Sequence, residues 1–259
     1  MTRKAFEIID IPNRTEKPRN TGLTMVLDKG LGYYAAQDLM EYASECIDII
    51  KLGWGTHRLC SEEAVRRKIR LYTDNNILVS NGGTLFEIAY LQRKINEFFE
   101  YAHKIGLSSI EISDGSIRIS REERSEIIRK CKNMGFEVFT EVGKKNPLED
   151  AMLTMEYRIK EAKRDLDAGA TKVIMEARES GKGIGVYDKE GKIKEDMVKK
   201  LTEGIGVREI MFEAPEKSQQ VYFILNLGPE ANLGNIKPED VIPLETLRRG
   251  LRGDTLGRL

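Results

Sequence analysis

The sequence predicts an α/β protein that folds as one (β/α)8 TIM barrel, a single domain over residues 1–259. Its length of 259 residues suits one such barrel, which typically uses about 250 residues. From Leu23 onward, short apolar or β-branched runs alternate with longer amphipathic runs, which is typical of strand–helix units on a parallel sheet. No G-x-G-x-x-G motif follows the first expected strand, and the units are even in length. A closed barrel is therefore favoured over an open doubly wound sheet.

Eight segments have the short apolar or β-branched composition of buried strands. The eighth has the weakest pattern. In chain order the expected strands are Thr24–Leu27, Ile47–Leu52, Ile77–Ser80, Ser109–Ser113, Glu137–Val142, Lys172–Glu176, Glu209–Glu213 and Ala231–Ile236.

Between these segments, apolar residues recur at spacings of three and four, as expected for helices that bury one face. Ser61 and Ser120, each followed by acidic residues, predict helix N-caps, and Gly106, Gly135 and Gly169 predict helix ends. The clearest apolar stripe consists of Leu85, Ile88, Leu91, Ile95, Phe98, Phe99 and Ala102.

Charge and cysteine content exclude several classes of protein. Lys plus Arg equals Asp plus Glu at 42 each, so nothing marks the chain for nucleic acid or an anionic membrane. The N-terminal residues lack a signal-peptide core, and no apolar run approaches the roughly 20 residues that span a bilayer. Cys46, Cys60 and Cys131 are too few and scattered for a disulfide framework or a zinc cluster. The expected location is the cytoplasm.

The segment from Glu179 to Lys194 is long and rich in glycine for a connection between a strand and a helix. Such loops over the mouth of a barrel often act as lids. A hairpin exposed to solvent, turning at Lys189–Gly191, fits the sequence equally well.

Polar residues gather at the expected C-terminal ends of the strands, which form the catalytic face of this fold. This position gives them more weight than polar residues elsewhere. In chain order they are Asp28, Lys29, Lys51, Asn81, Glu111, Ser113, Asp114, Glu141, Lys144, Lys145, Glu176, Arg178 and Glu213.

The glutamates at the ends of strands four to seven are Glu111, Glu141, Glu176 and Glu213. Each alone could be a satisfied ion pair. Burying all of them is costly unless a metal and an anionic substrate complete the charge balance. Because no histidine or cysteine cluster accompanies them, the predicted cofactor is Mg²⁺, with Asp114 as an alternative ligand. The lysines beside them predict an anion site.

The two histidines offer little chemistry. His103 lies near the end of a helix, where it complements the helix dipole, whereas His57 follows the second strand and could reach the mouth. Acid–base work is therefore expected from a lysine or a carboxylate. No Ser-His-Asp set, nucleophile elbow or P-loop is present, which argues against ester hydrolysis and nucleotide phosphoryl transfer.

Eight short motifs, spread over nearly the whole chain, together resemble the phosphosulfolactate synthase family. They are TGLTMVLDKGLG, IDIIKLGWGT, VSNGGTLFE, IEISDGS, TEVGKK, MEARESGKGIG, FEAP and NLGNI. The resemblance implies a (β/α)8 barrel that adds sulfite to phosphoenolpyruvate, with Mg²⁺, to give (2R)-phospho-3-sulfolactate for coenzyme M synthesis. Members of the family also serve bacterial sulfolactate formation, so the pathway stays open.

The chemistry implied by the resemblance, together with the usual layout of barrels, gives expected roles to residues at the mouth. Lys144 matches the family's lysine after the fifth strand and is the expected proton donor. Lys29 and Lys51 are further catalytic candidates that could hold carboxylate or sulfite. The expected substrate-binding residues are Asp28, Asn81, Gly234 and Asn235, together with Arg178, Ser180 and Gly181 as an alternative anion nest.

Two other functions remain open at this point. Lys51 could form a Schiff base with a carbonyl substrate in a lyase or aldolase. The barrel could instead bind an anionic metabolite or partner without turning it over. Assembly into a homo-oligomer is compatible with the sequence.

Overall fold

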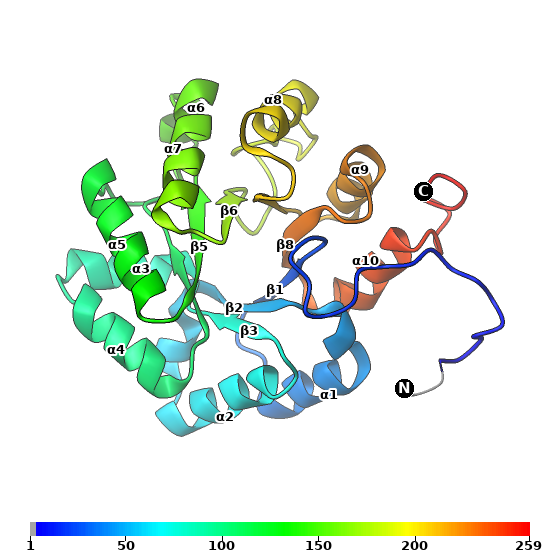
Figure 1. The fold of residues 1–259 in the computed structure, drawn as a ribbon, viewed down its shortest axis with the longest axis horizontal. Helices are drawn as coiled ribbons and strands as arrows, with labels where there is room; N and C mark the ends of the chain where they lie inside the picture. Colours follow the sequence, from blue (N-terminus) through cyan, green and yellow to red (C-terminus); the bar gives the residue numbers. More distant parts are fainter. Residues whose placement is uncertain (1–3) are drawn as a thin grey trace.

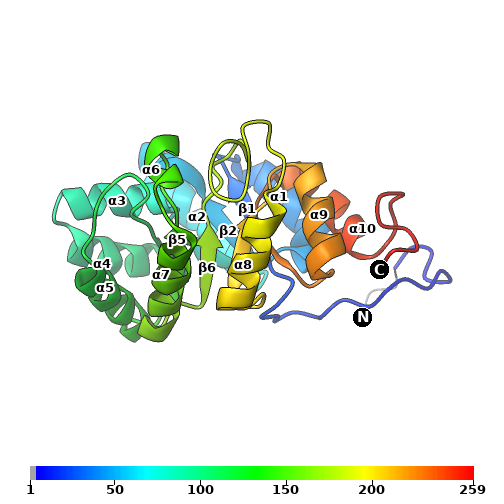
Figure 2. The same ribbon diagram turned by 90° about the horizontal axis from the view of Figure 1, so that it is seen from above.

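The computed structural model describes residues 4–259 and shows a closed barrel of parallel strands, ordered β1 to β8 around the ring (Figure 1). Figure 2 shows the barrel from the side, with β6 pointing toward the yellow loop region above it. The strands are β1 Thr24–Asp28, β2 Ile49–Leu52, β3 Leu78–Ser80, β4 Ser109–Ile112, β5 Glu137–Val142, β6 Lys172–Met175, β7 Ile210–Glu213 and β8 Asn232–Ile236.

The structure confirms the fold class and the position of all eight expected strands. Seven strands differ from the expected bounds by one or two residues at an end, and β5 matches at both ends. Even the weakly patterned eighth strand forms, and it closes the barrel by pairing with both β7 and β1.

Helices surround the ring of strands, and the capping residues expected from the sequence mark several of their ends (Figure 1). Ser61 and Ser120 each accept a hydrogen bond from a backbone N–H three residues later, while Gly106 and Gly169 end their helices in left-handed conformation. The helices are α1 Tyr33–Ala43, α2 Glu62–Thr73, α3 Gly83–Leu91, α4 Ile95–Ile105, α5 Arg121–Asn133, α6 Pro147–Ala151, α7 Met155–Ala168, α8 Glu195–Ile205, α9 Lys217–Leu227 and α10 Val241–Arg248.

The apolar stripe that starts at Leu85 does not belong to one continuous helical face. The chain leaves the helix after Leu91, and Arg93 adopts a φ of 58° before α4 begins. Leu91 is 67% exposed, whereas Phe99 is fully buried. The spacing of three and four continues across the break, so periodicity alone could not reveal it.

Side chains inside the barrel alternate with those that face the helices, as strand geometry requires. The lower interior is an apolar layer beneath the mouth. It consists of Leu23, Met25, Ile49, Phe139, Ile174 and Met211, with Leu78 packed against them.

The segment between β6 and α8 is a packed loop and includes an antiparallel bridge between Tyr187 and Ile193. Ile184 and Tyr187 are buried, and the Tyr187 hydroxyl donates to the carbonyl of Glu213. Gly185 N–H donates to Asp150 Oδ2 at 2.9 Å, which ties the loop to the segment after β5. The bridge agrees with the expected hairpin, but the buried residues contradict its exposure to solvent, and the anchors tie the loop to its surroundings.

The N-terminal segment is fastened to the base of the barrel. Arg14 forms ion pairs with Glu230 at 2.7 Å and with Glu245 at 3.3 Å. In both views this blue segment extends past α10 on the side where the C-terminal residues lie (Figures 1 and 2). Within residues 4–259, none of the helices combines the length and apolarity needed to span a bilayer.

Candidate active site

A cavity of about 340 Å³ opens at the C-terminal ends of the strands. Its position is the one expected for catalysis in this fold. The charged residues in its wall are Lys51, Glu111, Glu141, Lys145, Glu176, Arg178, Glu179 and Glu213.

The alternation of strand residues explains why these charges point into the barrel. Lys51, Glu141 and Glu213 follow Ile49, Phe139 and Met211 by two positions, so each pair shares one face of its strand. The charged layer therefore lies directly above the apolar layer. All four glutamates expected as metal ligands reach this layer and are at most 3% exposed.

Lys51 is the central cation of the glutamate ring. Its Nζ lies 3.0 Å from Glu213 Oε1, 3.1 Å from Glu111 Oε2 and 3.9 Å from Glu141 Oε2. Burial alone would lower the pKa of Lys51, but Glu111, Glu213 and Glu141 outweigh burial and raise it well above its usual value. Lys51 is therefore an ammonium group, which disfavours a Schiff base because that reaction needs a neutral amine.

The lysines do not neutralise all four glutamates of the ring, and the pKa values of these glutamates are shifted in different directions. Burial would raise the pKa of Glu141, but Lys145 and Lys51 lower it to about 2. Burial and the nearby Glu141 and Glu213 carboxylates raise the pKa of Glu176 well above its usual value. Burial, opposed by Lys51, raises the pKa of Glu213 to about 7. Glu176 and Glu213 therefore bind protons more tightly than an isolated glutamate does, and a bound cation would compete with those protons.

Lys145, in the loop after β5, lies on the cavity wall, and its Nζ is held between two carboxylates. It lies 3.1 Å from Glu87 Oε1 and 3.7 Å from Glu141 Oε1. Sequence reasoning missed Glu87 because it lies on α3, away from the strand ends where functional residues were sought. Thr84, on the same helix, also lines the cavity and was missed for the same reason.

Lys144, the expected proton donor, does not line this cavity. Its Nζ donates to the carbonyl oxygens of Asp114, at 2.6 Å, and Ile117, at 3.0 Å, and to Asp114 Oδ2 at 2.9 Å. These three acceptors saturate the ammonium group. Lys144 therefore fastens the loop after β4, whereas its neighbour Lys145 lines the cavity.

Asp28, expected to bind substrate, faces the surrounding helices and is fully buried there. Its Oδ1 accepts from the N–H groups of Gly30 and Leu31, and its Oδ2 accepts from Tyr72 and pairs with Lys68. It therefore holds the turn after β1 in place and does not line the cavity.

Asn81, also expected to bind substrate, joins two strands. Its Oδ1 accepts from Glu111 N–H at 2.8 Å, and its Nδ2 donates to the carbonyl oxygens of Gly82 and Glu111. Asn81 is fully buried and does not line the cavity.

Arg178 and Asn235 do line the cavity, and both adopt a left-handed backbone, with φ of 60° and 54°. Arg178 Nη1 donates to the carbonyl of Lys145 at 3.0 Å, which places the guanidinium beside that lysine. Asn235 Oδ1 is buried without a hydrogen-bond partner in the described part of the chain. Such strained or unsatisfied polar groups are typical of ligand sites.

The other members of the expected anion sites lie outside the cavity wall. Ser180 is exposed, and the carbonyl of Gly181 accepts from Gln219 Nε2. Gly234 accepts a backbone hydrogen bond from Ala214. After β7, the N-terminus of α9 is capped by the side chain of Glu216, which places a negative charge where barrels often bind phosphate.

Lys29 lies at the rim of the mouth. Its Nζ pairs with Glu179 at 2.5 Å and lies 5.6 Å from the centre of the Trp54 ring. This contact joins the loop after β1 to the loop after β6. Trp54 has a φ of 49°, a strained conformation for an aromatic residue, and it also lines the cavity.

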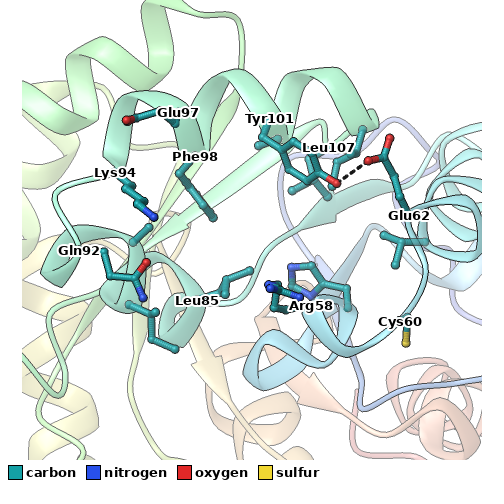
Figure 3. Close-up of a pocket in the computed structure, with 16 residues that line it drawn as sticks. Arg58, Cys60, Glu62, Leu85, Gln92, Lys94, Glu97, Phe98, Tyr101 and Leu107 are labelled. Carbon is teal, nitrogen blue, oxygen red and sulfur yellow. Dashed lines mark hydrogen bonds between the residues drawn. The ribbon is translucent and has the colours of Figure 1, made fainter.

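A second cavity, of about 760 Å³, lies outside the barrel between α2, α3 and α4 (Figure 3). Leu85, Phe98 and Leu107 give it a largely apolar wall, and Tyr101 donates to Glu62 at its edge. His57 lines this cavity and not the mouth, and burial lowers its pKa to about 4. The mouth of the barrel therefore holds the candidate active site without a histidine.

A family model described as (2R)-phospho-3-sulfolactate synthase (ComA) matches residues 12–254. A phosphosulfolactate synthase of Methanothermobacter thermautotrophicus is 49% identical over 255 residues, covering 98% of each chain. That of Methanocaldococcus jannaschii is 52% identical over 238 residues, covering 92% of this chain and 95% of the relative.

A solved structure confirms the barrel independently of sequence. The 3-hexulose-6-phosphate synthase of Salmonella typhimurium superposes with a TM-score of 0.54 at 14% identity, covering 91% of this chain and 94% of that one. This likeness concerns the fold alone. Membership follows from the full-length sequence matches, so the chain belongs to the (2R)-phospho-3-sulfolactate synthase family.

Proposed function

We propose that this protein adds sulfite to phosphoenolpyruvate, with Mg²⁺ as cofactor, to give (2R)-phospho-3-sulfolactate. The observation that carries the proposal is the buried ring of four glutamates around Lys51, with Lys145 and Arg178 on the same cavity wall. Family membership supports the choice of substrates. The product would supply coenzyme M synthesis, as the resemblance implies.

The residues present fit Mg²⁺ if two carboxylates hold it. Within residues 4–259, no group of three or more His, Cys, Asp or Glu residues is arranged to enclose a metal ion. Mg²⁺ is commonly bound by one or two carboxylates, with water and substrate oxygens completing its shell. Glu141 and Glu176 are the best pair, because Glu176 Oε2 is buried without a hydrogen-bond donor, and burial together with the nearby Glu141 charge raises the pKa of Glu176. When bound there, the ion would stabilise negative charge on the substrate carboxylate.

Sulfite needs no activating base, because its sulfur lone pair is already a strong nucleophile. Its attack on the methylene carbon forms the carbon–sulfur bond and moves the π electrons toward carbon 2 and its carboxylate. The protein has to stabilise that charge and hold the two anions together. Lys51, kept as an ammonium group by the glutamates, contributes fixed positive charge at the floor of the cavity.

Carbon 2 must then take a proton on one face, and Lys145 is the proposed donor. Its ammonium group borders the cavity and lies 3.7 Å from Glu141 Oε1, whereas Lys51 is already paired with Glu111 and Glu213. Proton transfer leaves a neutral amine, which solvent reprotonates before the next turnover.

The phosphate of the substrate is proposed to lie near Arg178 and Asn235. Arg178 supplies a guanidinium that can bind two phosphate oxygens. The alternative position at the N-terminus of α9 is disfavoured by the Glu216 cap. Lys29, paired with Glu179 at the rim, is placed to close over bound substrate.

The direct test incubates the purified protein with phosphoenolpyruvate, sulfite and Mg²⁺ and follows the loss of enol absorbance and the appearance of phosphosulfolactate. We expect turnover that chelator abolishes and that Mg²⁺ or Mn²⁺, but not Zn²⁺, restores, since oxygen ligands suit hard ions. Absence of product would refute the activity, and full activity after exhaustive chelation would refute the metal. Borohydride trapping with pyruvate-like substrates tests the Schiff-base alternative and should leave Lys51 unmodified.

A further inference from the structure

We propose that Glu87 is a positioning residue that holds Lys145 at the angle needed to protonate carbon 2. The inference rests on the proposed function, in which Lys145 is the proton donor. Glu87 lies on α3, is 3% exposed, and has no role in the addition chemistry described above.

A single oxygen of Glu87 gathers three groups that border the mouth. Its Oε1 lies 2.7 Å from Ser113 Oγ, 3.1 Å from the N–H of Ser116 and 3.1 Å from Lys145 Nζ. Lys145 N–H in turn donates to the carbonyl of Gly115 at 2.9 Å. The turn after β4 and the lysine after β5 are thus one unit, with the Glu87 carboxylate at its centre.

Glu87 also competes with Glu141 for the same ammonium group. Lys145 Nζ is closer to Glu87, at 3.1 Å, than to Glu141, at 3.7 Å. Without the charge on Glu87, the nearest carboxylate for Lys145 would be Glu141, a proposed metal ligand. We expect the lysine then to shift toward Glu141 and to lose the position that Glu87 gives it.

Replacing Glu87 with glutamine removes the negative charge of the side chain but nearly keeps its shape. The amide keeps an oxygen that can accept from Ser116 N–H, but it no longer attracts the ammonium group. If Glu87 had only a structural role, Glu87→Gln would still make the protein less stable. A loss of stability therefore does not distinguish the two roles. The informative quantity is whether the effect on kcat depends on Lys145.

The test is a double-mutant cycle of Glu87→Gln and Lys145→Ala, assayed with phosphoenolpyruvate, sulfite and Mg²⁺. We expect Glu87→Gln to lower kcat at least about tenfold, with KM for phosphoenolpyruvate within about twofold. In the Lys145→Ala background the same change should alter kcat less than about twofold, because residues that act as a unit are not additive. The solvent deuterium isotope effect on kcat should rise in Glu87→Gln, since proton delivery becomes slower.

Glu123→Gln is the matched control, because Glu123 is an exposed helical glutamate that accepts from Tyr90 at 2.7 Å, away from the mouth. It should keep wild-type kcat. If Glu87→Gln does not remain folded by circular dichroism, Glu87→Asp, which keeps the charge on a shorter arm, replaces it in the same cycle. An unchanged kcat in the Glu87 variant, or an equal loss in both backgrounds, overturns the positioning role. An inactive wild-type protein instead refutes the proposed function itself.

Discussion

Lys144 and Lys145 are neighbours in the chain, yet their ammonium groups lie in different surroundings. We expect Lys145→Ala to lower kcat by about 10²- to 10⁴-fold, the usual loss when a general acid is removed. Lys144→Ala should keep more than about a tenth of wild-type kcat and instead lower the melting temperature, because Asp114 and two backbone carbonyls lose their donor. Steady-state kinetics and thermal unfolding of both variants decide between the two lysines. A severe loss of kcat in Lys144→Ala at unchanged stability would reverse the assignment.

Arg178 offers a test of where the phosphate binds. A clamp on a non-reacting group stabilises ground state and transition state alike, so Arg178→Ala should raise KM for phosphoenolpyruvate more than it lowers kcat. Loss of one charge-assisted contact predicts a rise of about 10- to 100-fold. Arg118→Ala, outside the cavity wall, serves as the control. An unchanged KM in Arg178→Ala would remove Arg178 from the substrate site.

The sequence predicts which residues reach the cavity when they lie at the C-terminal ends of strands, because these ends form the mouth of the barrel. Lys51 and the four glutamates reach the cavity because they lie on inward faces of their strands. Asp28 does not, because it directly follows Leu27, which faces inward, and adjacent strand residues face opposite sides. Strand parity could have excluded Asp28. No comparable signal marks Glu87, whose importance depends on how α3 packs against the turn after β4.

Among the paired strands of the barrel, β3 and β4 share the fewest residue pairs. A single residue pair, Ser80 with Ser109, defines their register, whereas neighbouring strands share three or four pairs in most of the ring. Asn81 extends this pairing through its side chain, which bonds to both the N–H and the carbonyl of Glu111. Asn81, one of the residues expected to bind substrate, therefore links the end of β3 to β4 through its side chain.

Asn81→Ala should lower the free energy of unfolding by about 1–3 kcal/mol, because buried backbone groups of Glu111 lose their partners. The amide of Glu111 should also exchange with solvent faster, since the seam between β3 and β4 opens more often. Chemical denaturation and hydrogen exchange measure both effects. Asn226→Ala, which removes an exposed helical side chain, should change neither. Equal protection of the Glu111 amide in Asn81→Ala and wild type would contradict this role.

The elements themselves were largely predictable, and the exceptions have physical causes. Strands and helix caps follow from local composition, so all eight strands and the caps at Ser61 and Ser120 form as expected. The break between α3 and α4 leaves the apolar spacing intact and gives no periodic signal. The loop after β6 could not be placed because its anchors, such as Asp150 with Gly185, join residues far apart in the chain.

For the whole molecule, the glutamate ring makes stability depend on pH. The pKa of Glu213 is about 7 in the folded protein, above its ordinary value of 4.5, so the folded state binds this proton more tightly than the unfolded state. Proton binding by Glu213 therefore makes its full contribution to the free energy of unfolding below about pH 4.5. This contribution is lost as the pH rises through about 7. Each unit of pKa difference corresponds to about 1.4 kcal/mol.

Glu213→Gln should remove that dependence, because the amide does not titrate. In the presence of chelator, the free energy of unfolding of the wild type minus that of the variant should decrease between about pH 5 and pH 8. Chemical denaturation across this range measures the difference. Glu209→Gln, directly before β7 and outside the cavity wall, provides the control and should show no such trend. A difference that increases with pH would mean that Glu213 is stabilised as a carboxylate.

The ammonium group of Lys51 also bears on whether the barrel must bind metal and substrate in order to fold. It lies within hydrogen-bonding distance of Glu111 and Glu213. Part of the negative charge of the glutamate ring is therefore neutralised by a side chain of the protein itself. The raised pKa values of Glu176 and Glu213 also make protonation of these two carboxyl groups easier, which would reduce the buried negative charge further. We therefore expect the barrel to fold without added metal, and binding of the proposed Mg²⁺ and substrate to follow folding as a reversible step that leaves the fold unchanged.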